Sequence, residues 1–378
     1  MVFLHAEFMG AALRGRCDAK ALKSRWANMT PDIGLILGID GIATGSIYVL
    51  VGLGLVLIFS VTRVVFVPFG DIVAFSALTL ASMQLGRLPG TVYLVAVLAV
   101  IACLVDAGHH WRRGRSRHIV RGLLGYGALP LVPAAIAWLT AGMHLPAWVQ
   151  IPLAIALVVP IAPLIERIAL RPLADASILL LLIVSVALTF GLSGLGLLFF
   201  GPEGFRTDPL THQIFRFGAV VLTAQTLLMV AAAIVFSLLL YLFFETTLTG
   251  KALRATAINR VGARIVGIRP ASAGTLAFLL ASLLGAISGI LIGPTTTLYY
   301  DSGFIIGLKA FVGAIIGGLV SYPGTALGAV LVGLLESFAS FWNSSLKEVA
   351  VFGLLIPVLL WRSLSLAQVD EEDAEVDE

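Results

Sequence analysis

A basic segment between two long apolar stretches, residues 247–270, carries the side chains of this sequence best suited to binding another macromolecule. It contains five cations and no acidic residue: Lys251, Arg254, Arg260, Arg264 and Arg269. Read as a helix, it also places four apolar residues at i, i+3, i+7 and i+10, in one stripe beside the cationic face: Ile258, Val261, Ile265 and Ile268. This pattern predicts either docking into a groove on a soluble partner or resting on anionic lipid headgroups.

Ionisable residues also stand inside apolar stretches, where a charge is costly and is expected to face a partner or a cavity. We expect Lys309 to pair with Asp301, Asp71 or Glu336, to snorkel to the headgroups, or to line a path for a polar solute. Asp71 follows Gly70 at the start of an apolar segment. There its carboxylate either complements the helix dipole or faces a translocation path.

The sequence contains no pattern of residues that predicts an enzyme active site. Residues 249–252 contain a Gly-Lys pair but lack the earlier glycine and the following Ser or Thr of a phosphate-binding loop. His109, His110 and His118 lie in an arginine-rich stretch and are expected to be solvated rather than to bind a metal. We therefore predict no catalytic site, no metal and no cofactor. If transport is active, the ATPase must be a separate chain.

The elements that position these residues are apolar helices. A mean hydropathy of +1.03 with 12% charged residues excludes an ordinary soluble domain, in which about 25% of residues are charged. Because lipid admits only helices or closed barrels, we predict an all-α polytopic bundle. Eleven apolar segments can be drawn: 33–61, 66–86, 90–107, 121–141, 147–166, 177–200, 217–244, 272–293, 303–320, 324–341 and 347–362.

The distribution of Lys and Arg predicts the orientation of the bundle. With residues 245–271 inside and the segments alternating, the inside connections hold 14 cations and the outside connections four, so the C-terminus is expected in the cytoplasm. Eleven crossings would then translocate the five cations that precede residue 33. We favour a re-entrant segment at 66–86, which Pro68 and Gly70 interrupt, giving about ten spans and a cytoplasmic N-terminal extension at 1–32.

The remaining organisation follows from composition. Residues 33–366 form the predicted membrane domain, which includes an inserted loop and helix at 108–146 and the basic segment at 247–270. The tail at 367–378 is expected to be disordered, because seven of its last nine residues are acidic. Without those seven acids the net charge rises from +3 to +10. This excess belongs to the predicted cytoplasmic face and requires no nucleic acid to explain it.

Glycines at four-residue spacing predict close helix packing, either within the chain or against a second subunit. The clearest examples are Gly285, Gly289 and Gly293, followed by Gly313 and Gly317.

Several segments in order give the chain a family resemblance. They are Gly45-Ser46-Ile47-Tyr48 before Gly52-Leu53-Gly54-Leu55, Glu166-Arg167 before Leu170-Arg171-Pro172-Leu173, Phe200-Gly201-Pro202, and Gly303-Phe304 through Gly307-Leu308-Lys309-Ala310-Phe311 to Gly317-Gly318-Leu319 and Pro323-Gly324. With the basic segment, they resemble LivH-type permeases, the membrane subunits of branched-chain amino acid ABC importers. The resemblance covers roughly residues 33–366, apart from the insertion.

The resemblance implies an inner-membrane permease that works with ABC ATPase subunits, a second permease subunit (LivM-like or a second copy) and a periplasmic solute-binding protein. In such importers the basic segment is the coupling loop, and its contact or loop-shaping positions here would be Gly250, Lys251, Arg254, Ala255, Arg264 and Gly267.

Residues 66–71 depart from the family's usual Asn-Phe-Ala-His-Gly-Glu, because they read Phe-Val-Pro-Phe-Gly-Asp. If this stretch contacts the solute, the departure weighs against branched-chain amino acids in particular. Amino acids lead as the class of solute, ahead of urea or short amides and small carboxylates. A stand-alone secondary transporter or channel, and a membrane scaffold without transport, stay open as other classes.

Overall fold

The computed structural model describes residues 31–111, 127–143, 145–173, 176–211, 213–217, 220–319, 321–344 and 346–360. The predicted acidic tail lies outside these ranges, as do residues 1–30 of the predicted N-terminal extension. Residues 112–126 and 144 of the predicted insertion, with His118, also lie outside them.

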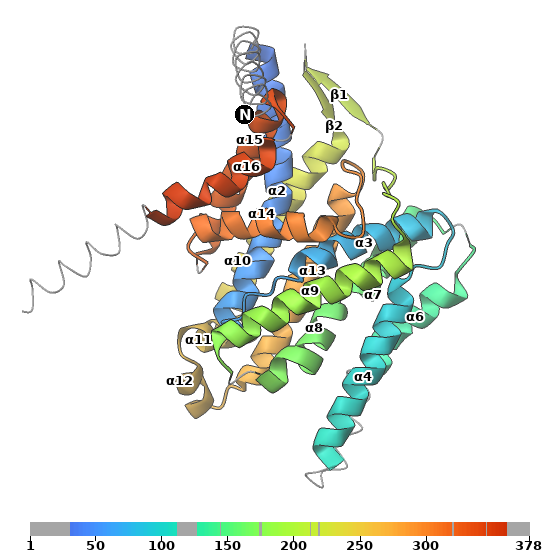
Figure 1. Cartoon of the computed structure of the whole chain (residues 1–378), viewed down its shortest axis with the longest axis vertical. Coiled ribbons are helices and arrows are strands. Elements are labelled where there is room, and N and C mark those ends of the chain that lie inside the picture. Colours follow the sequence, from blue (N-terminus) through green and yellow to red (C-terminus); the bar gives the residue numbers. More distant parts are fainter. Residues whose placement is uncertain are drawn as a thin grey trace, which may run out of the picture.

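Each predicted apolar segment contains a helix, so the all-α prediction is confirmed (Figure 1). The main helices are α2 (Pro31–Thr62), α3 (Phe69–Gln84), α4 (Thr91–Trp111), α6 (Leu129–Leu139), α7 (Ala147–Val158), α9 (Ile178–Phe200), α10 (Ala224–Thr246), α13 (Pro270–Ile292), α14 (Ser302–Ile316), α15 (Tyr322–Trp342) and α16 (Leu346–Gly353). Within the described ranges, six helices are long and apolar enough to cross a membrane, and others are shorter apolar helices.

One segment departs from helix. The predicted segment 217–244 begins as part of an antiparallel hairpin of β1 (Ile214–Phe217) and β2 (Val220–Thr223), in which Ile214 pairs with Thr223. The β-branched side chains of β2 favour a strand. Thr223 then caps α10, because its side chain accepts a hydrogen bond from the backbone N–H of Thr226.

Figure 1 shows the hairpin at one end of the molecule and the short helices α11 (Leu248–Ile258) and α12 (Arg260–Ile265) at the other. We call these ends the hairpin face and the loop face. Helix α2 begins near the hairpin and ends beside α11, where the Arg63 guanidinium donates a hydrogen bond to the Ala257 carbonyl at 3.2 Å.

The predicted re-entrant segment at 66–86 contains α3, and whether it crosses the membrane stays a prediction. The segment leaves the loop face at Arg63 without helix, and α3 then runs across the middle of the molecule and ends away from α11 and α12 (Figure 1). There the Gln84 side chain accepts a hydrogen bond from the backbone N–H of Asp208, in the connection that leads to the hairpin, at 2.9 Å. Pro68 stands at the N-cap of α3, and Gly70 lies in its first turn. Pro31 lies near the hairpin face, at the end of α2 away from α11 (Figure 1), and the count of about ten spans stays as predicted. Which side residues 1–30 occupy stays a prediction.

Helix α2 forms the centre of the bundle and packs against α10, α13, α14 and α15. Its most apolar window is 83% buried, whereas the corresponding windows of α9 and α10 are 22% buried. Helices α9 and α10 therefore lie at the periphery, where a membrane protein exposes apolar side chains to lipid.

The predicted glycine stripe on α13 packs within the chain. Its members are Gly285, Gly289 and Gly293. Gly285 faces the Phe69 ring, a methyl group at Gly289 would overlap the Val73 carbonyl of α3, and Gly293 lies against Thr207. Close helix approach is what small residues permit where lipid supplies no hydrophobic drive.

A second glycine contact joins α14 to α15. A side chain on Gly313 would overlap the backbone of Ala329, and one on Gly317 would overlap that of Thr325. Gly38 of α2 has open space beside it. A glycine stripe at a subunit contact stays a prediction.

Prolines divide the helical segment after α7. Pro160 and Pro163 flank the start of α8 (Ile161–Ile165), which continues as a π-helical turn, η2 (Glu166–Leu170), and a 3₁₀ turn, η3 (Arg171–Leu173). This irregular end brings Glu166 and Arg171 to the loop face.

Candidate functional site

The basic segment 247–270 folds as two short helices rather than as the single helix expected from its periodicity. Thr247 caps α11 by accepting a hydrogen bond from the Gly250 N–H at 3.0 Å. Asn259 ends α11 and caps α12, since its side-chain oxygen accepts from the N–H groups of Val261 and Gly262 at 3.0 and 2.9 Å. Gly267 closes the segment with φ +88°, a conformation that favours glycine.

The break at Asn259 alters the predicted apolar stripe but leaves most of it exposed. Ile258, Val261 and Ile265 are 78%, 68% and 81% exposed, whereas Ile268 is half-buried. Leu253 and Ala263 are buried and attach the two helices to the bundle. The segment thus presents apolar side chains that nothing in the described chain covers.

The cations of the segment differ in their exposure and in their ion pairing. Lys251 and Arg264 are exposed, and Ala255 is half-buried. Arg254 forms an ion pair with Glu245 of α10 at 2.8 Å, with both side chains largely exposed. Such a pair contributes about 0–1 kcal/mol, so it leaves the Arg254 guanidinium available to a stronger partner.

Gly250 fixes α11 to the end of α10. It is buried, and a side chain there would overlap the Phe243 carbonyl. Helices α10 and α11 therefore meet closely enough to move as one body. This is a packing reason for glycine at a position that the family resemblance singled out.

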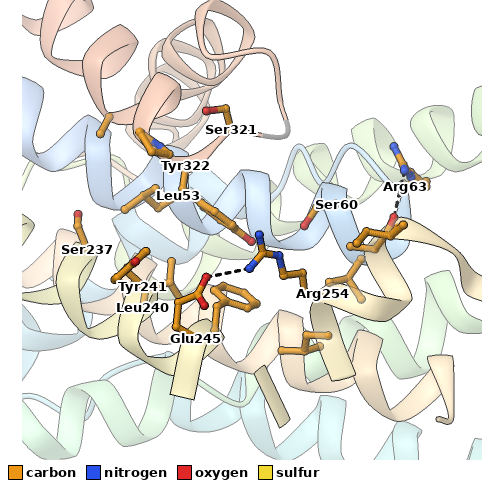
Figure 2. Close-up of a pocket in the computed structure, with 17 residues that line it drawn as sticks. Leu53, Ser60, Arg63, Ser237, Leu240, Tyr241, Glu245, Arg254, Ser321 and Tyr322 are labelled. Atoms are coloured by element: carbon orange, nitrogen blue, oxygen red, sulfur yellow. Dashed lines mark hydrogen bonds and ion pairs between the residues drawn. The ribbon is translucent and has the colours of Figure 1, made fainter. Parts of the chain in front are cut away.

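A cavity of about 640 Å³ lies beside this contact, among the loop-face ends of α2, α10, α11 and α15 (Figure 2). Its wall is mostly apolar, with Leu53 from α2 and Leu240 from α10. Hydroxyl groups from Ser60, Ser237 and Tyr322 line it as well.

The cavity has a charged edge and an aromatic wall. Figure 2 shows Arg254 and Glu245 joined at its border. The Phe244 and Tyr322 rings stack with their centroids 5.3 Å apart, and so connect α10 to α15. Sequence reasoning missed this cavity, because its only signal was single hydroxyl residues in separate apolar segments.

Lys309 is paired within the bundle. Its ammonium group lies 2.5 Å from a Glu336 carboxylate oxygen, and the other oxygen accepts a hydrogen bond from the Tyr48 hydroxyl at 2.6 Å. Both ionised side chains are largely buried, with exposed fractions of 5% and 13%. Of the three partners expected for Lys309, the structure selects Glu336, and the network ties together α2, α14 and α15.

Asp71 is fully buried, and neither carboxylate oxygen has a hydrogen-bond partner in the described chain. Neighbouring Gly70 packs against the backbone of Gly303 and Gly307 at the start of α14. The predicted path residues Gly70 and Asp71 thus meet α14, but Lys309 forms its ion pair elsewhere.

A bundle of apolar helices, with a cavity at one face and a cationic two-helix segment beside it, is the architecture of a polytopic membrane transport subunit. Residues 122–360 match the family described as the branched-chain amino acid transport system / permease component. The chain belongs to this permease family. Its members are multi-pass membrane transport subunits rather than enzymes.

Relatives in the same family share about a third of the aligned residues. The high-affinity branched-chain amino acid transport system permease protein BraD of Pseudomonas aeruginosa is 32% identical over 205 residues, 52% of this chain and 67% of BraD. The permease protein LivH of Escherichia coli strain K12 is 29% identical over 204 residues, 52% of this chain and 66% of LivH. A probable LivH of Methanocaldococcus jannaschii is 27% identical over 198 residues, 49% of this chain and 61% of that protein. The match thus spans about two thirds or less of each relative. No solved structure matches the chain.

Proposed function

We propose that this chain is the inner-membrane permease subunit of an ATP-binding-cassette importer for branched-chain or other amino acids. Two observations support the proposal together. The chain belongs to a permease family whose relatives serve branched-chain amino acid transport systems. It also carries a cavity of about 640 Å³ directly beside a cationic two-helix segment with uncovered apolar side chains.

In this proposal the loop face lies in the cytoplasm and the hairpin face in the periplasm. The excess of 14 cations over four on the connections supports this orientation. The C-terminus is then expected in the cytoplasm, because the same count places Arg362 among the inside connections.

Helices α11 and α12 then form the coupling loop, and a separate ABC ATPase binds them. Exposed Val261 and Ile265 enter an apolar groove on the ATPase, while Lys251, Arg254 and Arg264 meet acidic side chains at its rim. Gly250, Ala255 and Gly267 shape the loop: Gly250 by its close approach to α10, Ala255 by its small half-buried side chain, and Gly267 by its backbone conformation.

The cavity is the inward end of the solute path. Its apolar wall suits an aliphatic side chain, and its hydroxyl groups offer hydrogen bonds to a polar backbone. A permease of this kind needs only weak contacts with the solute, because a periplasmic binding protein supplies the affinity and delivers the solute to the hairpin face. A second permease subunit, LivM-like or another copy of this chain, completes the membrane unit.

The docking test reverses two charges and measures capture of the ATPase from native membranes in mild detergent. Arg254→Glu with Arg264→Glu is expected to lose the ATPase and ATP-dependent uptake in proteoliposomes, while expression and insertion stay normal. Arg87→Glu with Arg216→Glu reverses the same number of charges near the hairpin face and serves as the matched control. Retention of both the ATPase and uptake by the first variant would contradict docking through these residues.

A charge swap separates docking from the internal ion pair. Glu245→Arg with Arg254→Glu restores a pair between α10 and α11 but presents the wrong charge to the ATPase. We expect the swapped protein to remain uncoupled; full recovery would assign Arg254 to the internal pair alone.

A stand-alone transporter is the competing function, and the feature it would use is the buried carboxylate of Asp71, which has no hydrogen-bond partner among the described residues. The same purified chain, reconstituted alone, decides between the two. Solute movement without ATPase or ATP would overturn the importer proposal.

A further inference from the structure

A second cavity at the loop face, of about 230 Å³, gathers three guanidinium groups from two distant parts of the sequence. Arg171 comes from η3, and Arg260 and Arg264 come from α12. One carboxylate, Glu166, also lines the cavity. Apolar residues of α9 and α13 complete the wall, among them Phe278.

The positive charge of this cavity is only partly compensated within the described chain, by an electrostatic interaction between Glu166 and Arg171. None of the three arginines forms an ion pair with a described residue. The Glu166 carboxylate already accepts a hydrogen bond from the Thr275 hydroxyl at 3.0 Å and is outnumbered by three cations to one. The Nε of Arg260 is buried without a hydrogen-bond partner.

The arrangement is also unfavourable without a counter-ion. Arg260 and Arg264 are four residues apart on a helix of six residues, where like charges destabilise the helix. A buried N–H donor without an acceptor adds a desolvation cost. An anion in the cavity would remove both penalties, and the planar guanidinium group is the side chain best matched to phosphate oxygens.

We propose that this cavity binds the phosphate group of an anionic phospholipid headgroup. The apolar wall favours a lipid over free phosphate, because Leu181 of α9 and Phe278 of α13 belong to helices long enough to cross the membrane. Most of the α9 window is not buried in the protein, so acyl chains can follow that helix away from the cavity. Basic pockets between membrane helices at the cytoplasmic side commonly hold such headgroups.

The bound lipid would connect α12 and η3, two parts of the loop face that the chain itself joins only loosely. Its phosphate would hold α12 to η3, while its acyl chains lie against α9 and α13. Arg264 also belongs to the proposed ATPase contact, whereas Arg171 and Arg260 do not, so these two arginines separate lipid binding from docking.

The test is native mass spectrometry of the full chain in detergent micelles, titrated with phosphatidylglycerol or with phosphatidylcholine. We expect preferential binding of phosphatidylglycerol to one saturable site. Arg171→Gln with Arg260→Gln should weaken this binding by about 25-fold, from about fivefold for each arginine. Arg216→Gln with Arg269→Gln removes two exposed cations outside the cavity and should leave the site intact.

Three results would overturn the lipid assignment. Equal weakening by both double variants would show unspecific attraction to the surface charge. Competition by inorganic phosphate as strong as by phosphatidylglycerol would assign the site to the free anion. Unchanged lipid binding in the Arg171/Arg260 variant, together with loss of the ATPase, would assign these arginines to a carboxylate of the partner.

A charge-preserving variant guards against misfolding as the cause of lost binding. Arg171→Lys with Arg260→Lys keeps the charge but not the forked geometry, and should fall between the wild type and the Gln variant. Because lipid binding is read without the ATPase, its failure leaves the docking proposal untouched.

Discussion

The buried network of Lys309, Glu336 and Tyr48 allows a quantitative test of how this bundle tolerates charge. Lys309→Met leaves Glu336 as an unpaired buried carboxylate that keeps only the hydrogen bond from Tyr48. Breaking a buried ion pair by removing one partner costs about 3–5 kcal/mol. Since the Tyr48 bond at 2.6 Å survives, we expect a loss of about 3 kcal/mol in the free energy of unfolding.

Removing both charges should recover most of this loss. Lys309→Met with Glu336→Leu replaces the pair by apolar side chains, which is often neutral or stabilising. We therefore expect the double variant to lie within about 1 kcal/mol of the wild type. Tyr48→Phe removes one hydrogen bond to a charged acceptor and should cost about 1.5–3 kcal/mol by itself.

Equilibrium unfolding in mixed micelles of rising dodecyl sulfate content, followed by tryptophan fluorescence, measures these differences. Interhelical hydrogen bonds in membrane proteins average only about 0.6 kcal/mol in double-mutant cycles, so the buried ion pair should stand clearly above them. The reasoning is refuted if the Lys309 variant and the double variant are equally destabilised. Uptake by the stable double variant then tests the other role expected for Lys309, because a residue of the solute path would lose transport although the fold is kept.

Three further predictions concern packing, burial and capping. Gly289→Leu should abolish stable folding, since even a methyl group would overlap the Val73 carbonyl, whereas Gly191→Leu on open α9 should fold; size-exclusion profiles of the detergent-extracted proteins compare them. Asp71→Asn should not lower the unfolding free energy, because no hydrogen bond is lost; a loss above about 1 kcal/mol would reveal a hidden partner. Asn259→Ala should cost about 1 kcal/mol locally and speed hydrogen exchange in residues 260–268, and unchanged exchange would refute its capping role.

The bounds of some helices were accessible from the sequence because their apolar runs end at charged residues, prolines and glycines. The segment expected at 272–293 is α13, from Pro270 to Ile292, and that expected at 324–341 is α15, from Tyr322 to Trp342. The sequence did not predict which face of each helix is buried. Helices α2 and α9 are comparably apolar all round, yet their apolar windows are 83% and 22% buried, because only neighbouring helices decide what packs inside.

For the site, too, local features could be predicted from the sequence, whereas contacts between distant segments could not. The basic segment and its cations were found from composition, but its shape was predicted wrongly. Periodicity alone favoured one helix, while the side-chain oxygen of Asn259 satisfies two backbone N–H groups and starts a second one. The choice of Glu336 for Lys309 among three acids, and the gathering of hydroxyls around the cavity, depend on contacts between segments more than 20 residues apart.

The contacts around the cavity indicate which of its walls can separate. On one side, α10 and α11 are joined by the close approach of Gly250 to the Phe243 carbonyl. On the other side, α2 and α15 are held by the close approach of Gly45 to the backbone of Val330 and by the Lys309–Glu336–Tyr48 network.

Besides the packing of α2 against α10, two specific contacts join these bodies: the stacked rings of Phe244 and Tyr322 and the hydrogen bond from Arg63 to the Ala257 carbonyl. If a partner docks on α11 as proposed, we expect the force it applies to reach α10 first. We then expect the cavity to widen or close by the breaking and remaking of these bridging contacts, and not by unpacking of the centre of the bundle.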